Sequence, residues 1–179
     1  MHMMSLLRQL ARDRRGVSAV EFALLAPMMI ALLIGTAEVS QGVGADRKVS
    51  LVTAALANLT AQVSTISSTD MTNILDASSA IISPYSATLL SMTVTCLKID
   101  ANKNVSVKWS VTRGGNVNSG TMTIPTALAV ANSQLIFSQV SYAYTPGLGG
   151  RITGTLTLSD QMYMSPRITA PTYGTTTCT

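Results

Sequence analysis

Charged and aromatic side chains are scarce in this sequence. Asp, Glu, Lys and Arg together make up 11% of its 179 residues, aromatic residues make up 4%, and Trp109 is the only tryptophan. Because charged residues are usually about a quarter of a globular domain, serine and threonine must fill most polar positions here. The core has to be built from Val, Ile, Leu, Met and Ala.

Enzymatic signatures are missing as well. His2 is the only histidine, so the rest of the chain lacks the usual general base and metal ligand. There is no nucleophile-elbow, P-loop or dinucleotide-binding glycine motif. The aspartates Asp70, Asp76, Asp100 and Asp160 are scattered, and capping and solvation explain them. The sequence therefore predicts no enzyme, no catalytic residues, no cofactor and no metal site.

The net charge of +4 does not indicate a nucleic-acid partner. Arg8, Arg12, Arg14 and Arg15 against Asp13 place +3 in the first 16 residues. The remaining residues hold eight Lys and Arg against seven Asp and Glu, a net charge of +1. No basic patch is left that could neutralise a phosphate backbone.

What the chain does have is a long apolar run near its N-terminus, RRGVSAVEFALLAPMMIALLIGTA over residues 14–37. Between Arg15 and Glu38 the only charged residue is Glu21. Residues 17–37 would form a helix about 31 Å long, enough to cross a bilayer core. Because basic residues beside a span stay in the cytoplasm, the residues after 37 are expected outside the inner membrane, in the periplasm or beyond.

The start of this run resembles a prepilin. A basic leader containing Arg14 and Arg15 precedes Gly16, and four residues later comes Glu21-Phe22. With Pro27 six residues after the glutamate, this is similar to the TadE-like pseudopilins, the minor pilins of the Tad (Flp) type IV pilus. The strand-like segment SQLIFSQVSYAYTP is also similar to that family, but Gln139 stands where its members often carry an acidic residue.

The resemblance implies a processing event and a set of partners. A prepilin peptidase would cut after Gly16 on the cytoplasmic side, making Val17 the new N-terminus and Glu21 the fifth residue. A glycine lets an extended backbone enter a protease site without a side-chain clash. The expected partners are that peptidase, other pilins and pseudopilins, and the inner-membrane pilus assembly platform. The expected function is structural, in Tad pilus assembly and so in adhesion and biofilm formation.

Two other interpretations of the apolar run are open. In one, it is an ordinary signal anchor whose Glu21 sits at headgroup level, and the protein is a secretion-system component that never enters a filament. In the other, it is a secretory signal peptide with an apolar region over residues 22–34 and a small-residue cleavage site at residues 35–37. The protein would then be a secreted soluble binding domain.

The expected organisation is a leader over residues 1–16, a transmembrane helix over residues 17–37 and an extracytoplasmic domain over residues 38–179. Pro27 is expected to kink the span, and Gly35, Gly42 and Gly44 to form a flexible joint after it. Within the domain, helices are expected over residues 45–83, a sheet over residues 88–164, and an irregular tail over residues 165–179.

Apolar residues spaced three and four apart predict the helices. The first stripe comprises Val49, Val52, Leu56, Leu59, Val63 and Ile66. It either packs on its own domain, which the lack of charged flanking positions favours, or forms a coiled seam with another subunit. One of Ser67, Ser68 and Thr69 should cap a second helix with Asp70 in its first turn, and Pro84 should end it.

From Thr88 the period changes to two, which predicts strands. Residues 90–97 and 105–112 are expected to form a hairpin around a turn at residues 100–104, with one face buried. A loop with a short helix at residues 126–131 follows, then strands over residues 134–144 and 152–164. The sequence thus predicts an α+β fold, with a long N-terminal helix and a second helix packed on an antiparallel sheet of about four strands.

The two cysteines, Cys96 and Cys178, would lie on the oxidising side of the membrane. A disulfide between them would tie the tail to the first strand. The alternative is a buried thiol at Cys96 and a loose Cys178. Two thiols without a histidine make a poor metal site.

Overall fold

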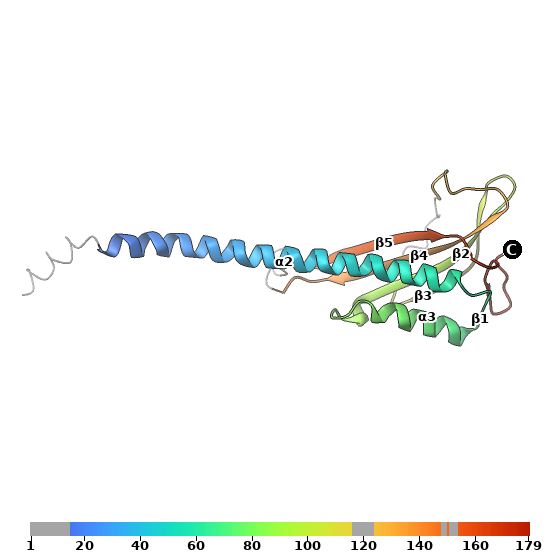
Figure 1. The fold of residues 1–179 in the computed structure, drawn as a ribbon, viewed down its shortest axis with the longest axis horizontal. Helices are drawn as coiled ribbons and strands as arrows, with labels where there is room; N and C mark the ends of the chain where they lie inside the picture. The colour runs from blue at the N-terminus through green and yellow to red at the C-terminus, as the bar shows by residue number, and fades with distance from the viewer. Residues whose placement is uncertain (1–14, 116–123, 148–149, 151–153) are drawn as a thin grey trace, which may run out of the picture. The chain divides into compact units, whose positions relative to one another are not determined.

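The computed structural model describes residues 15–115, 124–147, 150 and 154–179 (Figure 1). A long apolar helix begins this part of the chain, a second helix follows, and a four-stranded antiparallel sheet completes the fold. The predicted α+β class is confirmed. The chain divides into two compact units: the first ends at Ser40 and the second is Gln41–Thr179.

Helix α2 spans Arg15–Ala61 and contains Pro27. The expected flexible joint at Gly35, Gly42 and Gly44 does not interrupt the helix, because all three glycines are helical. Two of them are packing positions. A Cβ on Gly44 would lie 3.2 Å from the Tyr85 hydroxyl oxygen, and one on Gly42 would lie 3.6 Å from Cε1 of Tyr144. The expected kink at Pro27 stays a prediction.

The part of α2 that belongs to the second unit packs on the sheet. Ala45, Val49, Val52 and Leu56 are fully buried in the same core as residues of strands β2 (Leu90–Ile99) and β4 (Ser133–Tyr144). The Ser138 hydroxyl of β4 donates a hydrogen bond to the Thr53 carbonyl at 2.9 Å. The stripe therefore packs on its own domain, as favoured. The helical part of the stripe is shorter than predicted. Helix α2 ends at Ala61, so Val63 and Ile66 lie beyond the helix.

Helix α3 spans Ser68–Ala80 and begins with a capping box. The Ser67 hydroxyl accepts a hydrogen bond from the Asp70 backbone N–H at 3.1 Å, and the Asp70 carboxylate accepts from the Ser67 N–H at 3.0 Å. The predicted cap is confirmed. Hydrogen bonds from the Ser67 side chain and backbone lower the pKa of Asp70 below its ordinary value.

Replacing Ser67 by alanine is expected to lower the free energy of unfolding by about 1 kcal/mol, since a helix N-terminus loses its cap. Asp70 has a lowered pKa in the folded state, so its contribution is present above the unfolded-state pKa and is lost as pH falls through the folded-state pKa. Urea unfolding of both proteins at several pH values checks this. The difference in free energy of unfolding between the wild type and Ser67→Ala should become smaller in acid. A difference that does not change with pH would contradict the role of the Asp70 carboxylate in the capping box.

The sheet comprises β2 Leu90–Ile99, β3 Val105–Arg113, β4 Ser133–Tyr144 and β5 Leu156–Met164, in the order β3-β2-β4-β5. All neighbouring strands are antiparallel. The predicted hairpin of β2 and β3 is confirmed. Its turn is held by Asp100, whose carboxylate accepts the Asn104 N–H at 2.7 Å. This bond, together with the Asn104 side chain, lowers the pKa of Asp100.

The prediction that only one face of the hairpin is buried is wrong. The inner face of β2 packs on the helices, but Leu97 and Ile99 on its outer face are also fully buried. They belong to a second apolar cluster that contains Ile124, Leu135 and Phe137. Closer to the start of β2, the outer face carries hydroxyl groups instead. The hydroxyls of Thr95 on β2 and Ser110 on β3 form a hydrogen bond of 2.8 Å. The second cluster covers the outer face at this end of β2, so the period-two alternation does not mean that this face is exposed.

Three further details differ from the sequence predictions. The residues from 126 to 131 form turns rather than a helix. Strand β5 begins at Leu156, and the predicted start at Ile152 lies outside the described residues. The tail is not wholly irregular, because β6 Thr172–Tyr173 pairs in parallel with β1 Thr65–Ile66. The Trp109 indole N–H anchors this tail by donating to the Pro171 carbonyl at 3.1 Å.

Candidate functional site

The candidate site is the N-terminal part of helix α2. From Gly16 to Ala37 every side chain except that of Ala26 is exposed within the chain. Leu24 and Leu33 are exposed by 74% and 71%. A helix that is apolar on all sides and unburied needs an apolar environment from outside the molecule, either lipid or other helices.

The predicted processing residues lie at the beginning of this helix. Apart from its own helix backbone and chain neighbours, nothing lies within 4 Å of the position that a Cβ on Gly16 would take. Val17 and Glu21 are four residues apart and lie on the same helical face, one turn from each other. Arg14 lies outside the described residues, and of Arg15 the structure describes only the backbone at the start of α2.

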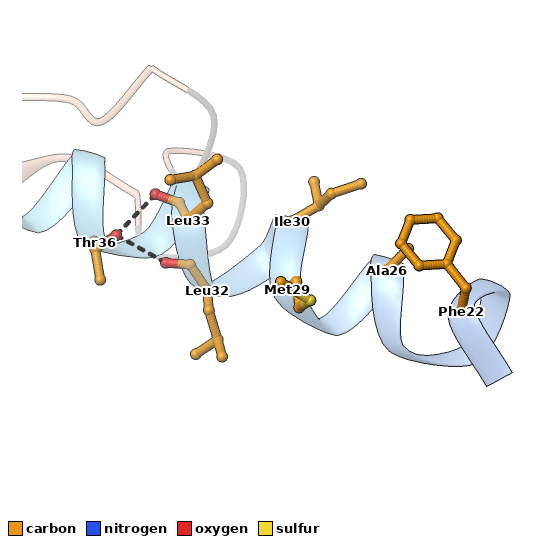
Figure 2. A pocket seen from close by; sticks show the side chains of 7 residues that line it. All are labelled: Phe22, Ala26, Met29, Ile30, Leu32, Leu33 and Thr36. Atoms are coloured by element: carbon orange, nitrogen blue, oxygen red, sulfur yellow. Dashed lines mark hydrogen bonds between the residues drawn. The ribbon is translucent and has the colours of Figure 1, made fainter. Parts of the chain in front are cut away.

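The face that begins at Phe22 is an apolar stripe (Figure 2). It is formed by Phe22, Ala26, Met29, Ile30, Leu32, Leu33 and Thr36. All of these residues come from one helix, and their side chains point in several directions around it (Figure 2). One helix cannot enclose a small ligand, so the stripe is a surface for packing rather than a binding cavity.

The one polar side chain on this stripe is satisfied inside the helix. The Thr36 hydroxyl donates hydrogen bonds to the carbonyls of Leu32 and Leu33 at 3.0 and 2.9 Å. A threonine bonded in this way is compatible with a hydrocarbon environment. Glu21 therefore remains the only ionisable residue between Val17 and Ala37.

A family model described as TadE-like protein matches residues 16–57. The N-terminal segment is therefore similar to TadE-like proteins. The match begins at the glycine of the predicted cleavage site and covers most of α2, including the buried residues from Ala45 to Ala57. No curated protein and no solved structure was found to be significantly similar to this chain.

The TadE-like match supports, in general terms, a minor pilin associated with a Tad pilus. This is a family of pilin-type structural proteins and not an enzyme family. Among the described residues, one helix is long and apolar enough to span a membrane, as a membrane-anchored pilin requires. Length and composition alone would also admit a signal sequence at this place.

The other predicted site residues lie far along the chain from the TadE-like segment. Cys96 on β2 and Cys178 in the tail form a disulfide, with their Cα atoms 6.0 Å apart and both residues fully buried. Within the described part of the chain, no group of three or more His, Cys, Asp or Glu side chains is placed to hold a metal ion.

Tyrosines that contact α2 form a cluster that the sequence pattern only partly indicated. Tyr142 and Tyr144 are buried on β4, on the face that meets the helix. The Tyr85 hydroxyl donates to the Gln41 carbonyl at 2.9 Å. Sequence analysis missed Tyr85, which directly follows Pro84. The prediction that Pro84 ends the second helix is wrong, because α3 ends at Ala80. The residue that departs from the family pattern, Gln139, lies on the opposite face of β4, paired with Thr93.

Proposed function

We propose that the chain is made as a prepilin, inserted into the inner membrane through residues 17–37, cut after Gly16 by a prepilin peptidase, and then built into a Tad pilus as a minor subunit. Residues 1–16 are the leader and remain in the cytoplasm. Residues 38–179 form the extracytoplasmic domain. The single observation that carries this proposal is the apolar segment of α2 over residues 16–37, which begins with Gly16 and Glu21-Phe22 and is exposed at every position except Ala26.

The chemistry of the mature N-terminus supports the same proposal. Cleavage would create a positively charged amine on Val17, one helical turn from the Glu21 carboxylate. Both charges would be costly in an apolar surrounding, and pairing offsets part of the desolvation of each. Within a filament, the carboxylate would meet the amine of its own or of a neighbouring subunit as the apolar helices pack together. Adhesion and biofilm formation would follow from the pilus.

Gly16→Leu is expected to leave the precursor uncut, because the bulkier side chain blocks backbone entry into the peptidase. Mass spectrometry of the purified N-terminus, in cells with and without a prepilin peptidase, measures this. Gly35→Ala is the matched control, since Gly35 is also helical and also has nothing within 4 Å of its Cβ position. It should be processed normally.

The wild-type N-terminus separates the three interpretations. A peptidase-dependent start at Val17 supports the proposal. A start at Glu38 would contradict it and leave a secreted domain with a cleaved signal peptide. An uncut Met1 in the presence of the peptidase would leave a membrane anchor only. Recovery of the protein in sheared filaments then distinguishes a pilus subunit from an anchored secretion component.

A further inference from the structure

One end of the second unit carries a cluster of three of the five tyrosines in the chain. The Tyr85 ring lies 6.2 Å from that of Tyr142 and 6.4 Å from that of Tyr144, measured between centroids. Tyr85 also contacts α2 through its hydrogen bond to Gln41, and Tyr144 contacts α2 beside Gly42. This end, called the tyrosine end below, is therefore fixed to residues 41–44 of the helix.

Three exposed aliphatic side chains surround the tyrosine end. Val43 lies between the two glycines that contact the rings and is 48% exposed. Leu156 is the strand partner of Tyr144, so it lies on the same face of the sheet, and it is 45% exposed. Leu89, 47% exposed, directly precedes Leu90, the strand partner of Tyr142. These three apolar side chains are exposed at the same end of the domain.

The chain itself limits how far this place can be from the membrane. The apolar run ends at Ala37, and Val43 follows six residues later. Six residues span about 9 Å as a helix and no more than about 22 Å when fully extended. Whatever angle the domain takes, the tyrosine end is tethered within that distance of the span.

We propose that the tyrosine end is a membrane-contact surface, on which Leu89 and Leu156 insert among the lipid headgroups on the periplasmic side of the inner membrane. This rests on the proposed function in one respect, that residues 17–37 span that membrane. Leu89 and Leu156 are aliphatic and nearly half exposed, so moving them from water to the apolar edge of the headgroup region is favourable. Such contact holds the domain against the bilayer until the subunit is extracted into a filament.

A lipid surface suits this cluster better than a second protein does. A stable protein interface buries about 800 Å² on each partner. Three half-exposed aliphatic side chains fall well short of that area. Shallow insertion at the headgroup boundary needs only a small apolar surface, since the apolar span already supplies the anchoring.

Fluorescence quenching in reconstituted vesicles tests the proposal on the full chain. Single variants Leu89→Trp and Leu156→Trp report on the tyrosine end, and the buried Trp109 gives a constant background. Val130→Trp is the control, because Val130 is 61% exposed and precedes the start of β4, whose other end carries Tyr144. Leu25→Trp reports on the span. The vesicles contain phosphatidylethanolamine and phosphatidylglycerol brominated near the headgroup or deep in the chain.

The proposal expects headgroup-brominated lipid to remove most of the added emission of the Leu89 and Leu156 variants and none of that of the Val130 variant. Deep bromines should quench the Leu25 variant. If the Leu25 variant is quenched while the Leu89 and Leu156 variants are not, the contact proposal is wrong and the span stands. An unquenched Leu25 variant would instead contradict the proposed function. Emission at Leu89 that shifts with protein concentration but not with lipid would assign the surface to a second copy and overturn the proposal.

Discussion

Replacing Cys96 and Cys178 together by alanine is expected to lower the free energy of unfolding of the domain by about 4–5 kcal/mol. The disulfide joins residues 82 positions apart, so its loss frees a long loop in the unfolded chain. The chain-entropy model gives this figure as an upper value. The tail also loses its covalent attachment to the central strand, which leaves β6 and the contact between Pro171 and Trp109 to hold it.

Urea unfolding of the full chain in detergent, followed by Trp109 fluorescence, measures this effect. Trp109 suits the purpose because it is buried and its ring lies 5.7 Å from that of Tyr173 in the tail. The reduced wild type keeps both sulfur atoms, so its difference from the double variant isolates the packing lost with them. Reductant should have no effect on the double variant. Equal stability of the oxidised and reduced wild type would contradict the prediction.

Elements whose information is local could be predicted from the sequence. The Ser67 and Asp70 box needs only two side chains three residues apart, and both lie where the sequence indicates a helix start. The hairpin of β2 and β3 follows from two alternating runs around a short turn. In both cases the residues that interact are neighbours in the chain, so propensity and spacing describe most of the interaction.

Elements that depend on residues far away in the chain could not be predicted from the sequence. The pairing of Thr65 with Thr172 joins two very short parallel strands that are far apart in the chain. Neither strand has a recognisable sequence pattern of its own. The helix continues through Gly42 and Gly44, where the Tyr144 ring and the Tyr85 hydroxyl lie close beside it. The sequence predicts a freely moving backbone at these glycines, whereas their lack of a side chain leaves room for partners that the local sequence does not reveal.

The candidate site is recognised mainly from the order of its residues along the chain, and less from how its side chains are arranged in space. A glycine, a glutamate and an apolar run could be recognised from the sequence alone, and the structure adds that no part of the described chain buries the run. Under the proposed function, the molecules that complete the site are the peptidase, the bilayer and neighbouring helices. In the isolated chain the apolar run is therefore left uncovered, and Glu21 near its beginning is exposed.

Glu21→Ala is expected to leave cleavage intact and to reduce incorporation into filaments on the order of 100-fold or more. If the carboxylate pairs with a Val17 amine inside the helix bundle, its removal leaves a buried positive charge without a partner. Breaking a buried pair in this way costs about 3–5 kcal/mol, and each 1.4 kcal/mol corresponds to a tenfold change. Quantitative immunoblots of sheared filaments against the membrane fraction give the ratio.

Thr36→Val is the matched control for this variant. It also removes a polar group from the apolar run, but that hydroxyl is already bonded to the helix backbone and needs no partner from another chain. Its incorporation should equal that of the wild type. If Glu21→Ala enters filaments as well as Thr36→Val does, the carboxylate has no role in assembly. If Glu21→Ala instead remains uncut, the glutamate acts in recognition by the peptidase, and the pairing with the Val17 amine loses its support.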